Sequence, residues 1–467
     1  MISASHSSNI VAFVHTYQSD GGFDPYMTAV VHAFEAVGLN VHVICTNDLV
    51  PHLGATSLRS GVSETKLVEY INRLNPVFIF STNRGGITQA IMDGTSCPII
   101  TRMVDLIPFY HQGGEGKPLF CERDQVFVPT QESVVAFEQR YPILTGKVHY
   151  LPFATDPDAF DAVDYVEQVI PVSFVGTYFY CEKLTDILAQ LQRGDSSKRE
   201  AFLDFIQSLK GDFHMDDQAL DPIRDICTDV KMSVDDIRML VSNAYALNKR
   251  IHYLDAVSDL GLHLYGTENW IKASQYSLPL ISCFQFGEQI NNRDKLIRLY
   301  QSSKIALNIP HHQAGPGMPY RVYDIMASRA LLITEYHPDS ELFSLFGRNM
   351  PVPMYRNAME LSSLVDYYLN HEEERLAIVT RCNALIREKK LTFQDKGKVY
   401  CEAAGVMLNS DLQGSMSRVA PDKFSISVML DSNVVARNWR GGIKAVLRWL
   451  VPYALWIRLG DRRHGRR

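Results

Sequence analysis

The segment Ser303–Glu335 holds residue types that bind phosphate and ribose. An apolar run ends at Asn308, a loop of His, Gly and Pro follows, and a helix is expected to begin near Tyr320. Glycines let a backbone approach a ligand closely, and the free N–H groups at a helix N-terminus favour phosphate oxygens. An arginine in the first turn adds a bidentate contact, and an acid one turn later accepts hydrogen bonds from hydroxyls. The candidate binding residues are Asn308, Gly315, Gly317, Arg321 and Asp324. An ordinary loop with a capped helix explains the same pattern.

A second group of polar residues lies at expected strand ends in the first half of the chain. A carboxylate or imidazole in a cleft takes a proton from a reacting hydroxyl. Asp105 is therefore the first candidate for a general base and His111 the second. His15, Gly21 and Gly22 are expected at the same edge. The alternative for Asp105 and His111 is a loop residue that caps a turn or a helix.

Three common sites are not supported by the motifs. GPGMPY has Tyr320 where a dinucleotide fingerprint needs its third glycine, and HQGGEGKP has His111 where a P-loop needs its first. His311 and His312 are adjacent, with no carboxylate or further His at ligand spacing. These patterns weigh against a Rossmann dehydrogenase, a P-loop NTPase and a bound metal.

Short apolar runs alternate with helical patterns along most of the chain, which predicts parallel βαβ units in a doubly wound sheet. The pattern begins again at Pro171–Gly176, so two Rossmann-like halves are expected. A polar, acidic stretch at about 184–248 predicts a helical insert. The predicted strands are Asn9–His15, Asn40–Cys45, Pro76–Ser81, Cys97–Thr101, Gln125–Pro129, Val148–Pro152, Pro171–Gly176, Leu262–Tyr265, Lys304–Ile309 and Ala330–Thr334. The predicted helices include Pro25–Val37, Glu64–Leu74, Lys249–Leu260, Asn292–Gln301 and Tyr320–Ser328.

Several of these motifs resemble CgeB-like (spore maturation protein) glycosyltransferases, within the wider GT-B group that includes glycosyltransferase family 4. The resemblance is most specific at Leu307-Asn308, at RVYDIMAS beginning with Arg321, and at LLITEY. Asp324 stands at the second of the two acidic positions of family 4, and Pro316 stands at the first. Retention and inversion of the anomeric configuration of the transferred sugar therefore both stay open.

Two upstream segments extend the resemblance. VSFVGTYFYCEKL is similar to a segment that contacts donor phosphates, which implies this role for Gly176 and Lys183. KRIHYLDAVSDLGLHLYG is similar to an Arg-helix-strand-Gly unit, which adds Arg250 and Gly266 to the donor site. In the same way, the family places an Asp-containing, Pro-rich segment near the acceptor, which Asp105 resembles.

The resemblance implies an α/β protein of the GT-B class, with two Rossmann-like doubly wound domains facing a cleft. Residues 1–152 would form the acceptor domain, and residues 165–410 would form the nucleotide-sugar domain with its insert at about 184–248. Residues 411–433 are interpreted as a linker.

The last segment, Val434–Arg467, has a separate character. It holds nine basic residues, one acid and three of the four tryptophans, although the whole chain of 467 residues has a net charge of -6. Its basic residues recur at helical spacing, which predicts an amphipathic helix at an anionic membrane surface. The predicted membrane contacts are Trp439, Arg440, Lys444, Arg448, Trp449 and Trp456. A helix packed on the acidic body and a nucleic-acid arm are the alternatives.

Composition narrows the class of protein. Hydrophobic residues make up 46% and charged residues 21%, as in a globular protein. Eight cysteines without a CxxC pair indicate reduced thiols in a cytosolic protein. No signal peptide or membrane span is expected.

The leading hypothesis is a glycosyltransferase that moves a sugar from a nucleotide-sugar to a hydroxyl of a membrane-associated glycan or lipid-linked acceptor, in polysaccharide or lipopolysaccharide synthesis. The expected partners are the nucleotide-sugar donor, this acceptor and an anionic membrane surface, without nucleic acid. No cofactor or metal is expected, because helix dipoles and basic residues can neutralise a leaving diphosphate. The expected location is the cytoplasm, peripheral on the inner face of the cytoplasmic membrane. An inactive GT-B scaffold and a nucleotide-sugar epimerase are the alternatives.

Overall fold

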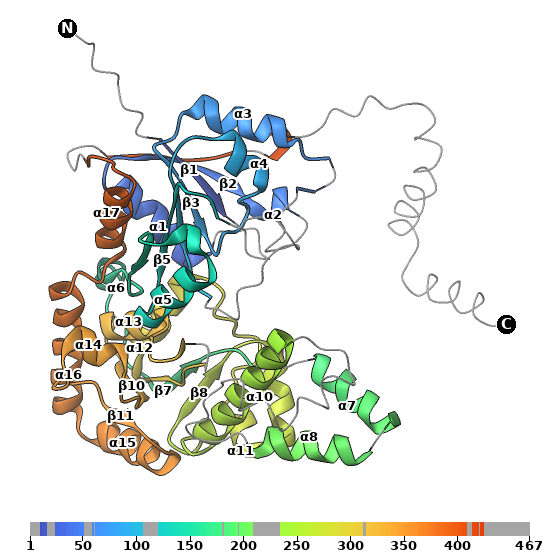
Figure 1. The fold of residues 1–467 in the computed structure, drawn as a ribbon. Coiled ribbons are helices and arrows are strands. Elements are labelled where there is room, and N and C mark those ends of the chain that lie inside the picture. The colour runs from blue at the N-terminus through green and yellow to red at the C-terminus, as the bar shows by residue number, and fades with distance from the viewer. Residues whose placement is uncertain are drawn as a thin grey trace, which may run out of the picture.

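Two parallel α/β domains lie one above the other in the computed structural model (Figure 1). The structure describes residues 10–15, 24–50, 58–59, 61–105, 120–179, 182–194, 196–208, 234–311, 314–408, 413–419 and 421–424. The predicted pair of Rossmann-like domains is confirmed.

The N-terminal domain is a parallel sheet of seven strands in the order β12-β2-β1-β3-β4-β5-β6. Its strands are β1 (Ile10–His15), β2 (Asn40–Cys45), β3 (Phe78–Thr82), β4 (Ile99–Arg102), β5 (Asp124–Val128), β6 (Val148–Tyr150) and β12 (Met416–Arg418). Its helices include α1 (Pro25–Glu35), α2 (Thr46–Leu49), α3 (Glu64–Leu74), α4 (Gln89–Gly94) and α5 (Gln131–Arg140). Alternate residues of β1 enter two cores: Phe13 packs on the side of α1, and Val14 packs on the side of α3. Burial on both faces explains the unbroken apolar runs of these strands.

The C-terminal domain is a parallel sheet of five strands in the order β11-β10-β9-β7-β8. Its strands are β7 (Ile170–Val175), β8 (Leu262–Tyr265), β9 (Ser303–Asn308), β10 (Leu331–Glu335) and β11 (Met354–Tyr355). Its helices include α6 (Pro157–Asp161), α10 (Val234–Asp255), α11 (Leu278–Ser282), α12 (Arg293–Ser302), α13 (Tyr320–Ala327), α14 (Glu341–Phe346), α15 (Ala358–Asn370) and α16 (Glu372–Glu388).

Helices do occupy the described part of the predicted insert. Helices α7 (Glu182–Gly194) and α8 (Ser196–Ser208) lie to one side of the C-terminal domain (Figure 1). Helix α10 is longer than expected, because one continuous helix joins the insert to the predicted helix that begins at Lys249.

The predicted boundary at residue 410 is wrong, because the chain returns to the N-terminal domain before it. Helix α17 (Phe393–Ala403) packs on α1, and its Tyr400 lies in the same core as Phe34 and Phe80 (Figure 1). Strand β12 then pairs with β2 at the edge of the seven-stranded sheet, so residues 413–419 and 421–424 are not a free linker. The predicted tail at 434–467 lies outside the described residues.

The two connections between the domains run side by side. Thr155 and Thr392 form a parallel bridge, and Phe393 N–H donates to Thr155 O at 3.0 Å. Because the two connections are hydrogen-bonded to each other, they hold the domains together at one place.

Candidate active site between the domains

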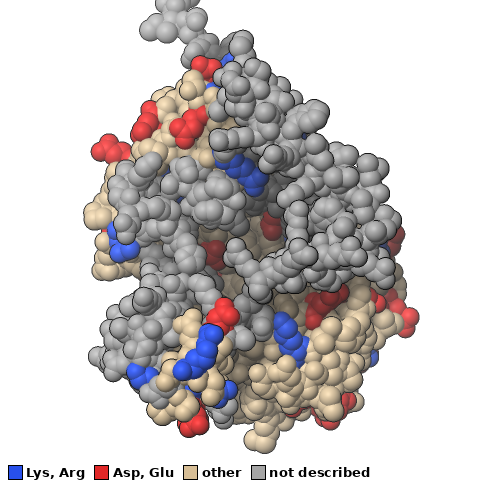
Figure 2. Space-filling model, turned by 90° about the vertical axis from the view of Figure 1, so that its right-hand side faces the viewer, with Lys and Arg blue, Asp and Glu red and all other residues tan. Residues whose placement is uncertain are grey.

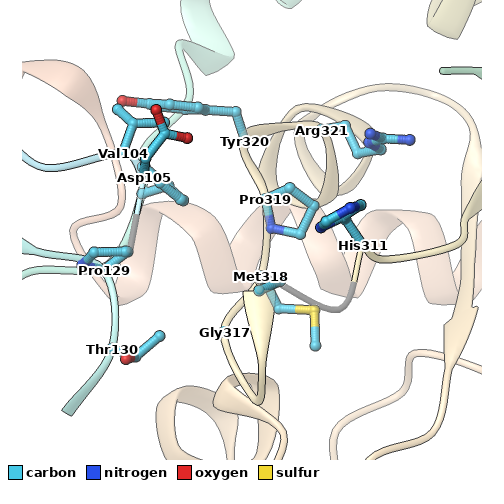
Figure 3. Close-up of a pocket in the computed structure, with 12 residues that line it drawn as sticks. Val104, Asp105, Pro129, Thr130, His311, Gly317, Met318, Pro319, Tyr320 and Arg321 are labelled. Carbon is cyan, nitrogen blue, oxygen red and sulfur yellow. The ribbon is translucent and has the colours of Figure 1, made fainter. Parts of the chain in front are cut away.

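A pocket of about 180 Å³ opens where the carboxyl ends of the two sheets face each other. The N-terminal side of its lining comes from Val104, Asp105, Pro129, Thr130 and Phe153, and the C-terminal side from His311, Ala314, Gly317, Met318, Pro319, Tyr320 and Arg321. Figure 2 shows a hollowed face with acidic and basic side chains gathered around it, and Figure 3 shows Asp105 across the pocket from Arg321. Ligands of doubly wound sheets bind at this edge.

Asp105 is held in place by the loop after β3. Asn83 adopts a left-handed backbone with φ 49°, which Asn tolerates better than most residues. Its side-chain Nδ2 donates to Asp105 Oδ2 at 2.7 Å, and its Oδ1 accepts from Val104 N–H at 2.7 Å and from Asp105 N–H at 3.1 Å. The neighbouring Arg84 forms a buried ion pair with Asp124 that anchors the loop to β5. The structure therefore brings the first general-base candidate into the pocket on a fixed support.

The other acceptor-side predictions have weaker structural support. His15 ends β1, but its side chain is not described. His111, Gly21 and Gly22 lie outside the described residues.

The loop before α13 brings the two domains together at the pocket. A Cβ built on Gly317 would lie 2.5 Å from Thr130 Cγ2 of the N-terminal domain, so only glycine permits this approach. Gly315 has a φ of +53°, and a Cβ there would meet no atom within 4 Å. Gly317 thus serves the contact between domains, whereas Gly315 serves the turn.

Two arginines converge on the carboxyl end of β7. Arg250 from α10 donates from Nη1 to Thr177 O, and Arg321 from α13 donates from Nη1 to Val175 O at 2.9 Å. Both guanidinium groups lie over the Phe174 ring, at 5.5 Å and 5.7 Å from its centroid. We call Arg250 and Arg321 the arginine pair.

The arginine pair has no counter-charge among the described residues. Arg250 is 1% exposed, and its Nε has no hydrogen-bond partner in the part of the chain that the structure describes. Burial, and to a smaller extent the charge of Arg321, lowers the pKa of Arg250. Within the described residues, no carboxylate forms an ion pair with either arginine. A buried cation without a partner is costly. The site therefore has the electrostatics of an anion-binding site.

Gly176 and Gly266 have packing roles that the sequence did not indicate. A Cβ on Gly176 would meet the Phe174 ring at 2.6 Å and Arg250 Nη1 at 3.4 Å. A Cβ on Gly266 would meet Gly176 O at 2.4 Å, and Trp270 Nε1 donates to that same oxygen at 2.8 Å. Both glycines allow β7 and β8 to end close to the arginine pair. Lys183 lies in α7, but its side chain is not described.

Asn308 and Asp324 are buried rather than open to a ligand. Asn308 is 0% exposed, and its Nδ2 donates to Thr334 Oγ1 at 2.9 Å. Asp324 is also 0% exposed; it accepts from Thr155 Oγ1 at 2.6 Å and from Tyr26 OH at 3.2 Å. The contact of Asp324 with ribose stays a prediction, and the structure shows instead that the carboxylate accepts hydrogen bonds from both sides of the domain contact.

Burial has a measurable consequence at Asp324. Desolvation raises the pKa of its carboxyl, while Arg293 at 3.6 Å and the bonds from Thr155 and Tyr26 oppose the shift. We refer to Asp324 and the similarly buried Glu341 as the interface carboxylates.

Sequence reasoning missed several residues of the pocket. Phe153 and Tyr320 supply aromatic surface, with ring centroids 4.1 Å apart, and Tyr320 also stacks on Tyr26 at 4.1 Å. Thr130 caps α5 and touches the loop before α13. A polar residue after an apolar strand was a usable signal for Thr130, but no local pattern marks the aromatic side chains.

Over the described parts of the chain, no group of three or more His, Cys, Asp or Glu residues is placed to hold a metal ion. Six of the cysteines lie in those parts, and all six are free thiols.

Residues 249–395 match the family model described as glycosyl transferase-like. This part of the chain is similar to glycosyl transferase-like domains. It extends from the end of α10 into α17 and includes both members of the arginine pair. Two facing parallel α/β domains agree with the predicted GT-B class, whereas the CgeB-like and family 4 assignments stay predictions.

Three solved structures are similar to this chain over most of its length. A glycosyltransferase from Rickettsia africae ESF-5 is 12% identical, with a TM-score of 0.49, over 84% of this chain and 98% of that one. Sucrose-phosphate synthase from Thermosynechococcus elongatus is 11% identical, with a TM-score of 0.49 and the same coverage. Anabaena HepE in complex with UDP and glucose is 10% identical, with a TM-score of 0.48, over 85% and 99%. Among curated proteins, no sequence matches the chain.

Proposed function

We propose that the protein is a glycosyltransferase that moves a sugar from a nucleotide-sugar to a hydroxyl of an acceptor bound between the domains. The observation that carries this proposal is the shared pocket, which unites Asp105 of one domain with Gly317 and Arg321 of the other. The glycosyl transferase-like match of the domain with the arginine pair supports the same reaction.

The arginine pair is proposed to bind the diphosphate of the donor. Two guanidinium groups at the end of β7 offer several N–H donors to phosphate oxygens, and arginine suits phosphate because its donors form a planar fork. The same charges stabilise the diphosphate as it leaves, which is the main electrostatic demand of the reaction. No metal is required in this account.

Asp105 is proposed to act as the general base. Its carboxylate, held by Asn83, accepts the proton of the acceptor hydroxyl as that oxygen attacks the anomeric carbon of the donor sugar. The apolar lining from Val104, Phe153 and Met318 limits water near the reacting carbon and so limits hydrolysis of the donor.

The acceptor is proposed to be membrane-associated, as a glycan or lipid-linked molecule in cell-surface polysaccharide synthesis. The composition of 434–467, with three tryptophans among nine basic residues, supports this part. No helix among the described residues has the length and apolar character needed to cross a membrane. Co-sedimentation with anionic vesicles tests the idea, because a chain without residues 434–467 should stay in the supernatant. Equal sedimentation of both chains would contradict the membrane role.

A donor-hydrolysis screen tests the reaction itself. The wild-type chain is incubated with UDP-, GDP-, TDP-, ADP- and CMP-sugars, and release of the nucleotide is measured. We expect one nucleotide class to be cleaved above the others. An inactive scaffold would cleave none and bind none, whereas an epimerase would change the sugar without needing an acceptor or the tail.

A further inference from the structure

Glu341, at the start of α14, bonds to three other parts of the molecule: the end of β6, helix α13 and the loop before α13. Its Oε1 accepts from Tyr150 OH at 2.8 Å, and its Oε2 accepts from Tyr323 OH at 2.6 Å and from Met318 N–H at 2.9 Å. Its own backbone N–H donates to Pro316 O at 2.8 Å. The side chain belongs to a residue only 6% exposed, so these bonds replace its contact with water.

Two of these partners belong to the loop that lines the pocket. Glu341 binds the loop on both sides of Gly317, at Pro316 O and at Met318 N–H. Gly317 and Met318 line the pocket, and Arg321 follows in the first turn of α13. The position of this loop decides where the donor lies relative to Arg321.

A third partner belongs to the opposite domain. Tyr150 ends β6, next to β5, and β5 leads into Thr130, which Gly317 approaches closely. The loop therefore meets one corner of the N-terminal sheet twice, by packing at Thr130 and through Glu341 at Tyr150. The same sheet carries Asp105, so this corner sets the distance between the base and the donor site.

The surroundings of Glu341 suit an acceptor of hydrogen bonds. Burial raises the pKa of its carboxyl, and the bonds from Tyr323, Tyr150 and Met318, together with the charge of Arg102, oppose this shift. Lys396 adds a further nearby positive charge. Three donors meet this single carboxylate, which explains why a buried acid is kept here.

We propose that Glu341 is a positioning residue that fixes the Pro316–Met318 segment against Tyr150, and so sets the geometry between Asp105 and the donor. The proposal rests on the proposed transferase function. A displacement of about 1 Å at reacting groups can cost on the order of a hundredfold in rate. Glu341 does not line the pocket and acts through the loop and through Tyr150.

Three variants and a control test the proposal, with sugar transfer from the donor that is cleaved best in the hydrolysis screen as the measured reaction. Glu341→Ala should lower kcat/KM on the order of a hundredfold, because all three side-chain bonds disappear. Glu341→Gln should restore most of this loss, because its carbonyl oxygen can accept from Met318 and Tyr323 while the Tyr150 hydroxyl turns to accept from its amide. Tyr150→Phe removes only the bond between domains, so kcat should fall about fivefold while the affinity for the nucleoside diphosphate stays unchanged.

The matched control is Asn383→Asp. Asn383 Nδ2 donates to Met326 O, Ser328 O and Val379 O, so the substitution also mismatches three bonds, but away from the pocket loop and the N-terminal domain. It should lower Tm without changing kcat or nucleotide affinity. If Tyr150→Phe keeps wild-type turnover, or if Glu341→Ala behaves as Asn383→Asp does, the proposal is overturned. A wild-type chain without nucleotide affinity overturns the proposed function and this inference together, whereas an active wild type with a fully active Glu341→Ala overturns this inference alone.

Discussion

Arg250 of the arginine pair and the two interface carboxylates are buried charges, but they differ in their partners. Arg250 bonds a backbone carbonyl and leaves Nε without an acceptor, while Asp324 and Glu341 each accept at least two hydrogen bonds from both domains or their connections. Burial of a charge is tolerated when bonds replace water, and it is costly otherwise. The satisfied carboxylates therefore hold the two domains together, whereas the arginine pair, which has no carboxylate partner among the described residues, is proposed to bind an anionic ligand.

The largest expected effect concerns Asp105, the proposed base, which lies across the pocket from Arg321. Asp105→Asn keeps the bond from Asn83 possible but cannot take a proton, so kcat of sugar transfer should fall about 10²- to 10⁴-fold. The affinity for the donor should stay unchanged, because the arginine pair is untouched. Steady-state kinetics with Asp93→Asn as the control, an exposed acid bonded to Gln89, checks this result. Wild-type kcat in Asp105→Asn would show that another group is the base.

Removal of the Asp324 carboxylate should act on stability rather than on donor binding. Asp324→Ala leaves Tyr26, Thr155 and Arg293 without their acceptor, so the free energy of unfolding should fall by about 2–4 kcal/mol. Urea unfolding measures this change, and the exposed Asp366→Ala should stay within about 0.5 kcal/mol of the wild type. A loss of nucleotide affinity at unchanged stability would instead support contact of Asp324 with ribose.

The pH dependence of the unfolding free energy gives a smaller effect for the same residue, in which the stabilising contribution of Asp324 falls as the pH rises. Burial raises the pKa of Asp324 in the folded state, so the folded chain holds this proton more tightly than the unfolded chain. Its contribution to stability is complete below the ordinary pKa of about 4 and is lost as pH rises through the raised pKa. The unfolding free energy of the wild type minus that of Asp324→Asn should therefore decrease with rising pH. A difference that increases with pH would contradict the desolvated carboxylate.

The smallest expected effect is that of a chelator. Because Arg250 and Arg321 are proposed to supply the positive charge for the leaving diphosphate, donor hydrolysis in EDTA should stay within about twofold of the untreated rate. Loss of activity that Mg²⁺ or Mn²⁺ restores would show that the arginine pair is insufficient.

The contrast between these regions also marks what the sequence could predict. The strands β1 and β3 were visible because both faces are buried, which leaves continuous apolar runs. Arg321 was predicted from its place in the first turn of a helix, and Arg250 from the resemblance, although their convergence depends on the pairing of β7 with β9. Strand β12 has three exposed residues and no alternation of apolar and polar side chains, so no local sequence pattern predicted it.

The position of Asp324 shows the main limit of prediction from the sequence. Its place in α13 was predicted correctly, but the face of the helix is buried by Tyr26 and Thr155, which lie 298 and 169 residues away in sequence. The same holds for Glu341, whose partner Tyr150 lies 191 residues away. Contacts at such separations come from the docking of two domains, which a reading of local motifs does not supply.

The most direct test of the arginine pair is titration calorimetry of nucleoside diphosphates against the wild type, Arg321→Ala and Arg329→Ala. Arg329 is a fair control, because it also bonds a backbone carbonyl, Val166 O at 2.7 Å, and lies over an aromatic ring, Tyr165. We predict that the wild type and Arg329→Ala bind one diphosphate with equal affinity, and that Arg321→Ala binds it at least tenfold more weakly, or about 1.4 kcal/mol. Equal binding by all three chains, or no binding by the wild type, would contradict the assignment of this site to the donor.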